Sequence, residues 1–362
     1  MQEKAVRTLN QFSCRTKIFS GAGAVSKLAD LCGENLLIVT DSYFMKNGTA
    51  QRLGMLSGAK KVTCFDKVQP DPTVELVAEG TAILRDRQAD TVVALGGGSA
   101  MDCGKAMVYF SQMPVRLIAI PTTSGSGSEV TDFAILTKDS IKHPLVDDKL
   151  QPDVAILDSD LLKELPQKLI ADTGFDVISH ALEAFVATGA NAITDAIAQS
   201  AFLTMMENLT LSYAGKAEVR GKVHMAATMA GLAFNQAGLG LCHAIAHSLG
   251  GMFHLPHGRL NAILLPEVML YNASAKYQHL AVAAGLGGAT EKIALRNLKN
   301  RLISLRRQLN MPDTLAQAGI HLENRIPEII AATLQDPCCA TNPVPVTAEG
   351  VGEILKAVSG YG

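Results

Sequence analysis

The hydrophobic pattern of the chain changes near residue 160, and this change limits the folds that it can adopt. Before that point, short apolar runs alternate with amphipathic segments. The runs are typical of strands and lie at 35–40, 60–65, 91–95, 116–120 and 154–157, with helical spacing at 73–88 and 99–112 between them. Strand–helix–strand repetition predicts a parallel sheet covered by helices on both faces.

The rest of the chain is rich in Ala, Leu, Met, Ile and Glu, and strand-like runs nearly vanish. Helical spacing predicts helices at 167–187, 192–209, 217–236, 241–251, 274–285, 290–308, 312–318, 324–335 and 347–357. The fold class that follows is α/β in the N-terminal part and all-α in the C-terminal part. We place the boundary near residue 160, which gives an α/β domain at 1–160 and a helical domain at 161–362.

A run of glycines follows the predicted strand at 91–95. Gly96, Gly97 and Gly98 let the backbone approach an anion closely, and the amides of the helix that begins after them can hold a phosphate. Ser99 is a candidate cap of that helix. The run is not the G-x-G-x-x-G fingerprint, and a tight turn followed by a helix cap is the alternative interpretation.

A second loop supports the phosphate interpretation. The stretch 121–129 follows the next strand and is dense in glycines and hydroxyl side chains, which suit phosphate and ribose oxygens. Two such loops at the carboxyl ends of neighbouring strands mark the ligand crevice of an open α/β sheet. Asp41 ends another strand, where its carboxylate would bind ribose hydroxyls and repel a 2′-phosphate, which favours NAD(H). Capping of the next helix is the alternative role for Asp41.

A carboxylate and several imidazoles have the spacing of a divalent-metal site. Asp176 and His180 are four residues apart, as are His243 and His247, so each pair lies on one face of a helix. His257 follows on a predicted loop, and segment 241–258 alone holds four of the nine histidines. Such groups, when they converge from separate helices, bind divalent metals. Helical spacing alone does not separate ligands from neighbours among these five residues.

Composition excludes several classes of partner. The 362 residues are 48% hydrophobic and carry a net charge of −2, which indicates a globular chain without the charge pattern of a nucleic-acid or anionic-membrane binder. No apolar run has the length of a signal peptide or a membrane span. The seven cysteines contain no C-x-x-C pair, so we expect free thiols in a reducing cytoplasm.

Taken together, these motifs resemble the iron-containing (group III) alcohol dehydrogenase family over nearly the whole chain. The stretches that carry the resemblance are 96–102 with Lys105, 121–129, 152–158, 173–183 and 237–258. The resemblance implies an N-terminal Rossmann-like domain, a helical C-terminal domain and a metal in the cleft between them. It also implies Fe²⁺ or Zn²⁺, NAD(H), and hydride transfer that interconverts short-chain aldehydes and primary alcohols, with the metal as Lewis acid.

The resemblance also divides the candidate residues. It implies that Asp176, His180, His243 and His257 hold the metal, and that His247 is a catalytic histidine near the nicotinamide. The residues that we assign to cofactor binding are Asp41, Gly96, Gly97, Gly98, Ser99, Asp102, Thr122, Thr123, Ser126 and Lys142. Arg259 and Val344 depart from the pattern of the family.

Within the family, the chain is most similar to the propanol dehydrogenases of bacterial microcompartments, on residues 142–145 and 238–243. This similarity implies propanal and 1-propanol as the substrate pair and a homodimer or higher homo-oligomer. It also suggests packaging with shell or enzyme partners, for which residues 1–10 are a candidate targeting segment. The alternatives are a polyol oxidoreductase resembling glycerol dehydrogenase, a lyase of the same fold, and a non-catalytic relative. The full Asp/His set and both glycine loops argue against them.

Overall fold

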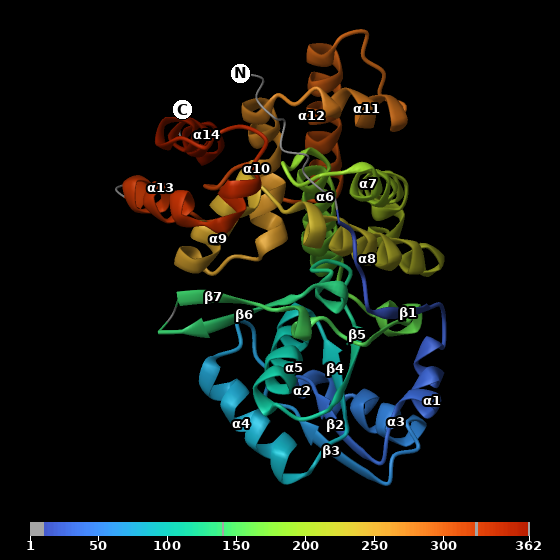
Figure 1. Cartoon of the computed structure of the whole chain (residues 1–362). Helices are drawn as coiled ribbons and strands as arrows, with labels where there is room; N and C mark the ends of the chain where they lie inside the picture. The colour runs from blue at the N-terminus through green and yellow to red at the C-terminus, as the bar shows by residue number, and fades with distance from the viewer. Residues whose placement is uncertain (1–10, 140, 323–324, 361–362) are drawn as a thin grey trace, which may run out of the picture.

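The computed structural model describes residues 11–139, 141–322 and 325–360. Figure 1 shows two parts, a sheet flanked by helices and a group of helices above it. The last strand of the sheet ends at Leu157, and the first long helix of the upper part begins at Gln167. The predicted fold class is confirmed. The candidate targeting segment 1–10 lies outside the described residues.

Six strands form one sheet in which every neighbouring pair is parallel. Their order is β1-β8-β5-β4-β2-β3. The strands are β1 (Lys17–Ser20), β2 (Asn35–Val39), β3 (Lys61–Phe65), β4 (Thr91–Gly96), β5 (Arg116–Pro121) and β8 (Val154–Leu157). Five of them were predicted from their apolar runs. The exception is β1, an edge strand whose residues are exposed or half-buried, so that it lacks an apolar run.

Alternate residues of the central strands pack on opposite faces of the sheet. One face carries Leu37, Val92 and Leu117, and the other carries Leu36, Val93 and Ile118. The first face is covered by α4 (Val74–Asp86) and α5 (Gly98–Ser111), and the second by α1 (Leu28–Leu31) and α3 (Thr49–Leu56). A sheet buried on both faces explains why its strands appear as continuous apolar runs in the sequence.

The chain changes direction across the sheet between β2 and β4. From β2 it moves outward to β3, returns to the other side of β2 as β4, and then continues to β5. The loops after β2 and β4 therefore diverge from adjacent strands, which leaves the crevice where open α/β sheets bind ligands. Asp41 lies just after β2 and Gly97 just after β4, so both lie at this crevice.

The upper part is built from helices around one hydrophobic core that extends from Ile170 to Val358. The helices are α6 (Gln167–Val186), α7 (Ala192–Tyr213), α8 (Arg220–Ala237), α9 (Leu241–Phe253), α10 (His257–Asn272), α11 (Lys276–Ala283), α12 (Glu291–Gln308), α13 (Ile326–Gln335) and α14 (Ala348–Ser359). Central α6 is buried almost throughout and packs against α7, α8 and α10. Within the described ranges, no helix has the length and hydropathy needed to cross a membrane.

Two predictions for this part are wrong. His257 does not lie on a loop but is the first residue of α10, a helix that we did not predict. The helix contains Pro266 and is buried on nearly all sides, so it has no amphipathic period. Residues 313–319 form bends and turns instead of a helix, and the backbone amides of Leu315 and Ala316 donate to the carbonyls of Val358 and Ser359 at the end of α14.

A hairpin that we did not predict lies between the sheet part and the helices (Figure 1). Its strands β6 (Phe133–Lys138) and β7 (Ile141–Val146) pair antiparallel. The hairpin packs on α5, and Lys142 on β7 forms an ion pair with Asp71 in the loop after β3, with 2.6 Å between Nζ and Oδ1. Lys142 therefore lies where the hairpin meets the sheet part.

The two parts also meet at a pair of glycines. Gly127, in the loop after β5, has a φ of +64°, and a Cβ built on it would lie 2.7 Å from the Cα of Gly231 on α8. The backbones of the loop and the helix are therefore in direct contact, which only two glycines allow.

Candidate metal and cofactor site

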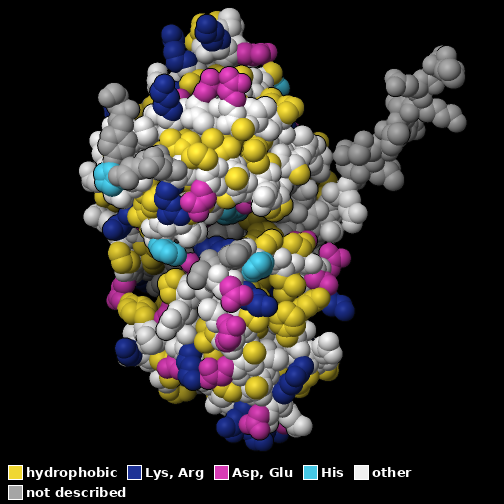
Figure 2. Space-filling model, turned by 90° about the vertical axis from the view of Figure 1, so that its left-hand side faces the viewer, with side chains coloured by type: hydrophobic (Ala, Val, Ile, Leu, Met, Phe, Trp, Pro, Cys, Tyr) yellow, Lys and Arg dark blue, Asp and Glu magenta, His cyan; other side chains and the backbone are white. Residues whose placement is uncertain are grey.

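Three helices bring the predicted metal residues together. Asp176 and His180 lie one turn apart on α6, His243 and His247 lie one turn apart on α9, and His257 begins α10. On the face of the molecule seen in Figure 2, a hollow separates the helical part from the sheet part, and histidine, lysine and arginine side chains lie at its edge.

Three of the five side chains converge on one point. One ligand atom each from Asp176, His243 and His257 lies within 4.8 Å of the other two. Asp176 Oδ1 is 4.0 Å from His243 Nε2 and 3.8 Å from His257 Nε2. A carboxylate oxygen and two imidazole nitrogens at these separations form a donor set for a divalent cation.

His180 lies beside this group, and its ring stacks on that of His243 at 4.6 Å between centroids. It is buried, and its Nδ1 has no hydrogen-bond partner among the described residues. A buried polar atom left unpaired is costly, so this nitrogen fits a site that takes a metal ion, although His180 is not among the residues whose donor atoms lie within 4.8 Å of one another. The residues present therefore fit the implied metal.

Two residues that sequence reasoning missed support the group. Glu183 bonds Nδ1 of His243, and it also accepts from the backbone amide of Cys242 at 2.7 Å. Asn261 donates from Nδ2 to Asp176 Oδ1 at 2.9 Å. Such partners fix the rings and carboxylates of a metal site. Glu183 lies seven residues after Asp176, and this spacing could have placed it on the same face of the predicted helix. No feature of the sequence indicates a role for Asn261.

Burial sets the protonation of this group. It lowers the pKa of His243 and of His257 well below the usual value, and neighbouring histidines lower both further. Burial also lowers the pKa of His180, opposed by the charge of Asp176. It raises the pKa of Asp176, which the charge of His180 opposes. The imidazoles are therefore neutral at neutral pH, which is the state that binds a metal.

A close approach of two helices holds Asp176 beside His257. A Cβ built on Gly258 would lie 1.8 Å from the carbonyl oxygen of Asp172, so α10 and α6 touch one turn before Asp176. Arg259, a departure from the family pattern, strengthens this contact by a bidentate ion pair with Asp172, at 3.0 Å from Nε and 2.6 Å from Nη2. Both side chains are largely buried.

The cofactor loops meet as predicted for neighbouring strands. The amide of Thr122 donates to the carbonyl of Gly96 at 2.8 Å. A Cβ on Gly97 would lie 3.4 Å from Thr123 Oγ1, and one on Gly98 would lie 3.2 Å from Ser126 Oγ. The glycine turn and the hydroxyl-rich loop therefore form one surface at the crevice.

The capping role that we predicted for Ser99 is wrong. Gly97 is the N-cap of α5, no side chain caps the helix, and Ser99 lies inside the first turn. The first amides of α5 are therefore without a side-chain acceptor, as a helix that receives a phosphate requires.

Three other predicted cofactor residues have partners within the protein. Asp41 caps α2 (Ser42–Lys46) by accepting from the amides of Tyr43 and Phe44. Asp102 accepts from Ser128 Oγ at 2.8 Å and from the amide of Ile135 at 3.1 Å. Lys142 pairs with Asp71, and its charge lowers the pKa of both Asp102 and His257.

The loop after β5 links the cofactor surface to the metal group. Gly125 packs against Thr173 of α6, where a Cβ would lie 2.9 Å from that of Thr173. A hydrogen bond with the Gly125 backbone also raises the pKa of His180, against the larger effect of burial. Ligands at the crevice and at the metal group would therefore be neighbours.

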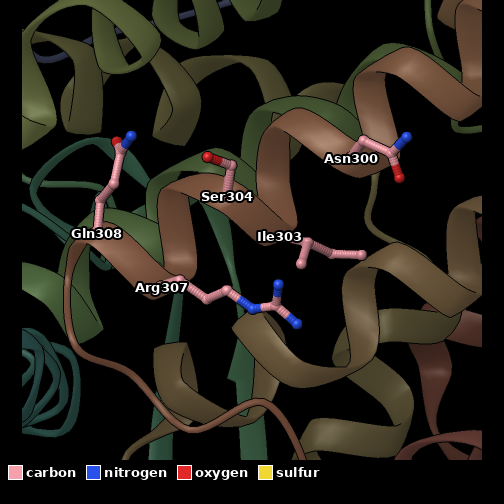
Figure 3. Close-up of a pocket in the computed structure, with 5 residues that line it drawn as sticks. All are labelled: Asn300, Ile303, Ser304, Arg307 and Gln308. Carbon is pink, nitrogen blue, oxygen red and sulfur yellow. The ribbon is translucent and has the colours of Figure 1, made fainter.

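A second hollow lies away from this site. It has a volume of about 520 Å³ and is lined by Asn300, Ile303, Ser304, Arg307 and Gln308. Figure 3 shows that all five side chains come from α12. A depression formed by one helix, with no converging donors, gives no indication of chemistry.

Comparisons with known proteins match nearly the whole chain to one family. The model of the Fe-containing alcohol dehydrogenase family, C-terminal, matches residues 170–359, and the model of iron-containing alcohol dehydrogenase matches residues 15–159. The 1-propanol dehydrogenase of Salmonella typhimurium is 38% identical over 96% of this chain and 99% of its own length. The NADPH-dependent butanol dehydrogenase of Clostridium saccharobutylicum is 35% identical over 96% of this chain and 97% of its own.

A solved structure has the same fold. The crystal structure of 1,3-propanediol oxidoreductase superposes with a TM-score of 0.93 at 30% identity, and the match covers 97% of this chain and 100% of that one.

Proposed function

The chain belongs to the iron-containing alcohol dehydrogenase family, and we propose that it reduces short-chain aldehydes such as propanal to primary alcohols with NADH. The convergence of Asp176, His243 and His257 beside the cofactor crevice is the observation that carries this proposal. A metal held by these residues and a nicotinamide held at the crevice would be neighbours, as hydride transfer to a bound carbonyl requires.

The metal would be held by Asp176, His180, His243 and His257, as the resemblance implies. These oxygen and nitrogen donors suit Fe²⁺, and they suit Zn²⁺ equally because no thiolate is among them. When bound, such an ion supplies Lewis-acid polarisation of the substrate oxygen. The position of the buried His180 ring, stacked on that of His243, supports its role as the fourth ligand.

The protein's own groups have separate tasks in this proposal. The free amides at the start of α5 hold the cofactor phosphates, and Thr122, Thr123 and Ser126 bind phosphate or ribose oxygens. Lys142 stabilises negative charge between the two sites. His247 exchanges the proton with the substrate oxygen.

The proposal is tested on protein purified without oxygen. We expect a bound divalent metal and NADH oxidation with propanal, and we expect a chelator to abolish both. No turnover with any short aldehyde by the metal-loaded protein would contradict the proposal.

The preference for NADH over NADPH rests on Asp41, and a relative that uses NADPH makes it worth testing. Asp41→Asn keeps the cap of α2, because an amide oxygen also accepts from backbone amides, but it removes the charge that repels a 2′-phosphate. We expect kcat/KM for NADPH to rise relative to NADH. An unchanged ratio would leave Asp41 as a cap only.

We also propose that the protein is a homodimer or larger, and that it is packaged in a microcompartment through residues 1–10. Both proposals are carried over from the resemblance to the propanol dehydrogenases of bacterial microcompartments. Light scattering tests the first. Removal of residues 1–10 from a fluorescent fusion tests the second, since unchanged localisation would exclude a targeting role.

A further inference from the structure

A carboxylate from the C-terminal part of the chain contacts His247. Asp336 lies between α13 and the short helix η7 (Pro337–Thr341), and its Oδ2 is 2.8 Å from His247 Nδ1. Its Oδ1 accepts from the amide of Cys338 at 2.9 Å, which caps η7. The two residues are 89 positions apart in the chain. Because the cap fixes the carboxylate, Asp336 is held toward the imidazole by the backbone.

The environment of Asp336 fixes its charge. Its side chain is 13% exposed, against 41% for His247. Burial raises its pKa, but the hydrogen bond and charge of His247 and the amide of Cys338 outweigh burial, so the pKa lies below the usual value. An ionised carboxylate can only accept, so the hydrogen between the two side chains belongs to Nδ1 of His247.

The ring of His247 is also fixed relative to the metal group. It stacks on His257 with centroids 4.9 Å apart and planes 15° apart, and it lies 6.1 Å from the ring of His243. Across the described ranges, Nε2 of His247 makes no hydrogen bond. With Nδ1 engaged by Asp336, Nε2 is therefore the nitrogen available to a substrate beside the metal residues.

We propose that Asp336 is a positioning residue that holds His247 in the Nδ1–H tautomer, so that Nε2 exchanges the proton with the substrate oxygen. The proposal rests on the proposed function and deepens it. In alcohol oxidation, the hydroxyl proton passes to Nε2 while the hydride on the carbinol carbon passes to the nicotinamide of NAD⁺. The products are an aldehyde, NADH and the imidazolium form of His247, whose Nδ1–H still donates a hydrogen bond to Asp336. Aldehyde reduction is the reverse.

The variant Asp336→Asn separates this role from the capping of η7. The amide oxygen of asparagine still accepts from Cys338, so the cap remains. The amide nitrogen donates to Nδ1 of His247, which moves the ring hydrogen to Nε2. We expect kcat to fall by about 10- to 100-fold, as for other residues that orient a functional histidine. The KM for aldehyde, the metal content and the thermal midpoint should stay as in wild type.

Asp147→Asn is the matched control. Asp147 caps another short helix, η3 (Asp148–Leu150), by accepting from the amide of Lys149 at 2.8 Å, and it has no contact with His247. We expect this variant to have wild-type kcat. A wild-type kcat in Asp336→Asn as well, or a loss of kcat that follows a loss of metal, would overturn the positioning role.

Nitrogen-15 NMR of histidine-labelled, zinc-loaded protein reads the tautomer without turnover. We expect the hydrogen of neutral His247 on Nδ1 in wild type and on Nε2 in Asp336→Asn. An Nε2–H tautomer in wild type would overturn the inference, whether or not the variant folds. If the tautomers are as expected but wild type does not turn over aldehyde, the proposed function fails and the tautomer assignment stands.

Discussion

His224 is buried in the helical part, and its protonation is coupled to folding. Its Nδ1 lies 3.0 Å from Ser124 Oγ, in the hydroxyl-rich loop. Burial lowers its pKa from 6.5 to about 4. The unfolded chain therefore takes up a proton near pH 6.5 that the folded protein does not take up until near pH 4. The contribution of this pKa difference to the free energy of unfolding is fully present above pH 6.5, and it is lost as the pH drops from 6.5 toward 4.

We predict that His224→Asn reduces this loss. One proton corresponds to about 1.4 kcal/mol per pH unit. Between pH 6 and pH 5, the free energy of unfolding of wild type should fall by about 1 kcal/mol more than that of the variant. Urea unfolding at both pH values measures the difference, and comparing the change with pH cancels any constant effect of the substitution. Equal losses would mean that His224 takes up its proton over the same pH range in the folded and the unfolded protein.

His257 and His247 should respond differently to removal. We predict that His257→Ala loses the bound metal and nearly all activity, because it removes one of three converging donors. His247→Ala should keep the metal and lose about 100-fold or more in kcat, the range of a missing proton-transfer group. Metal analysis together with steady-state kinetics separates the two. A metal-free His247→Ala would make His247 a ligand, and full metal in His257→Ala would refute its assignment.

The sequence predicts which donor groups meet at this site, but not how they converge. Spacing at i and i+4 placed Asp176 with His180 and His243 with His247, because those pairs depend only on the helix. Which of His180 and His247 lies near the metal-binding atoms of Asp176 depends on how α6 and α9 cross. The spacing of residues along the sequence does not give that crossing. Asp336 could not be found at all, since it meets His247 only through the packing of α13 and η7 against α9.

At the level of elements, the contact between α6 and α10 depends on Gly258. We predict that Gly258→Ala destabilises the protein by about 1–3 kcal/mol, as overpacking of a tight contact does, and weakens metal binding by moving α10 away from Asp176. Gly251→Ala is the control, because this position on α9 has nothing within 4 Å of a built Cβ. It should gain up to about 1 kcal/mol from helix propensity. Similar urea midpoints for the two variants would contradict the close approach.

The elements that were predicted and those that were missed differ in how they bury their residues. Buried parallel strands and amphipathic helices such as α12 have a period that a sequence shows directly. Helix α10 has no such period, because it is buried on nearly all sides and contains Pro266. The hairpin β6–β7 contains Pro144, which is unfavourable inside a strand, and its segment received no strand prediction.

In the whole molecule, the two proposed ligand sites belong to different hydrophobic cores. The proposed metal residues lie on the helices of the upper core, and the glycine turn lies at the end of a strand of the sheet. A ligand stabilises most strongly the region that it contacts. We predict that metal slows amide hydrogen exchange in α6, α9 and α10, and that NADH slows it at 97–101 and 122–126. Slower exchange of β4 on metal addition alone would contradict the placement of the metal, and α14 is the internal reference.

The contact between Gly127 and Gly231 has a consequence for engineering. The two backbones already touch, so the sheet part and the helical part cannot move closer together at this point. A side chain introduced at either glycine would push the two parts apart. Such a substitution would separate the proposed metal site from the proposed cofactor site without enlarging the space for a substrate. Variants for bulkier aldehydes should therefore be sought by trimming side chains within the cleft and leaving this glycine pair intact.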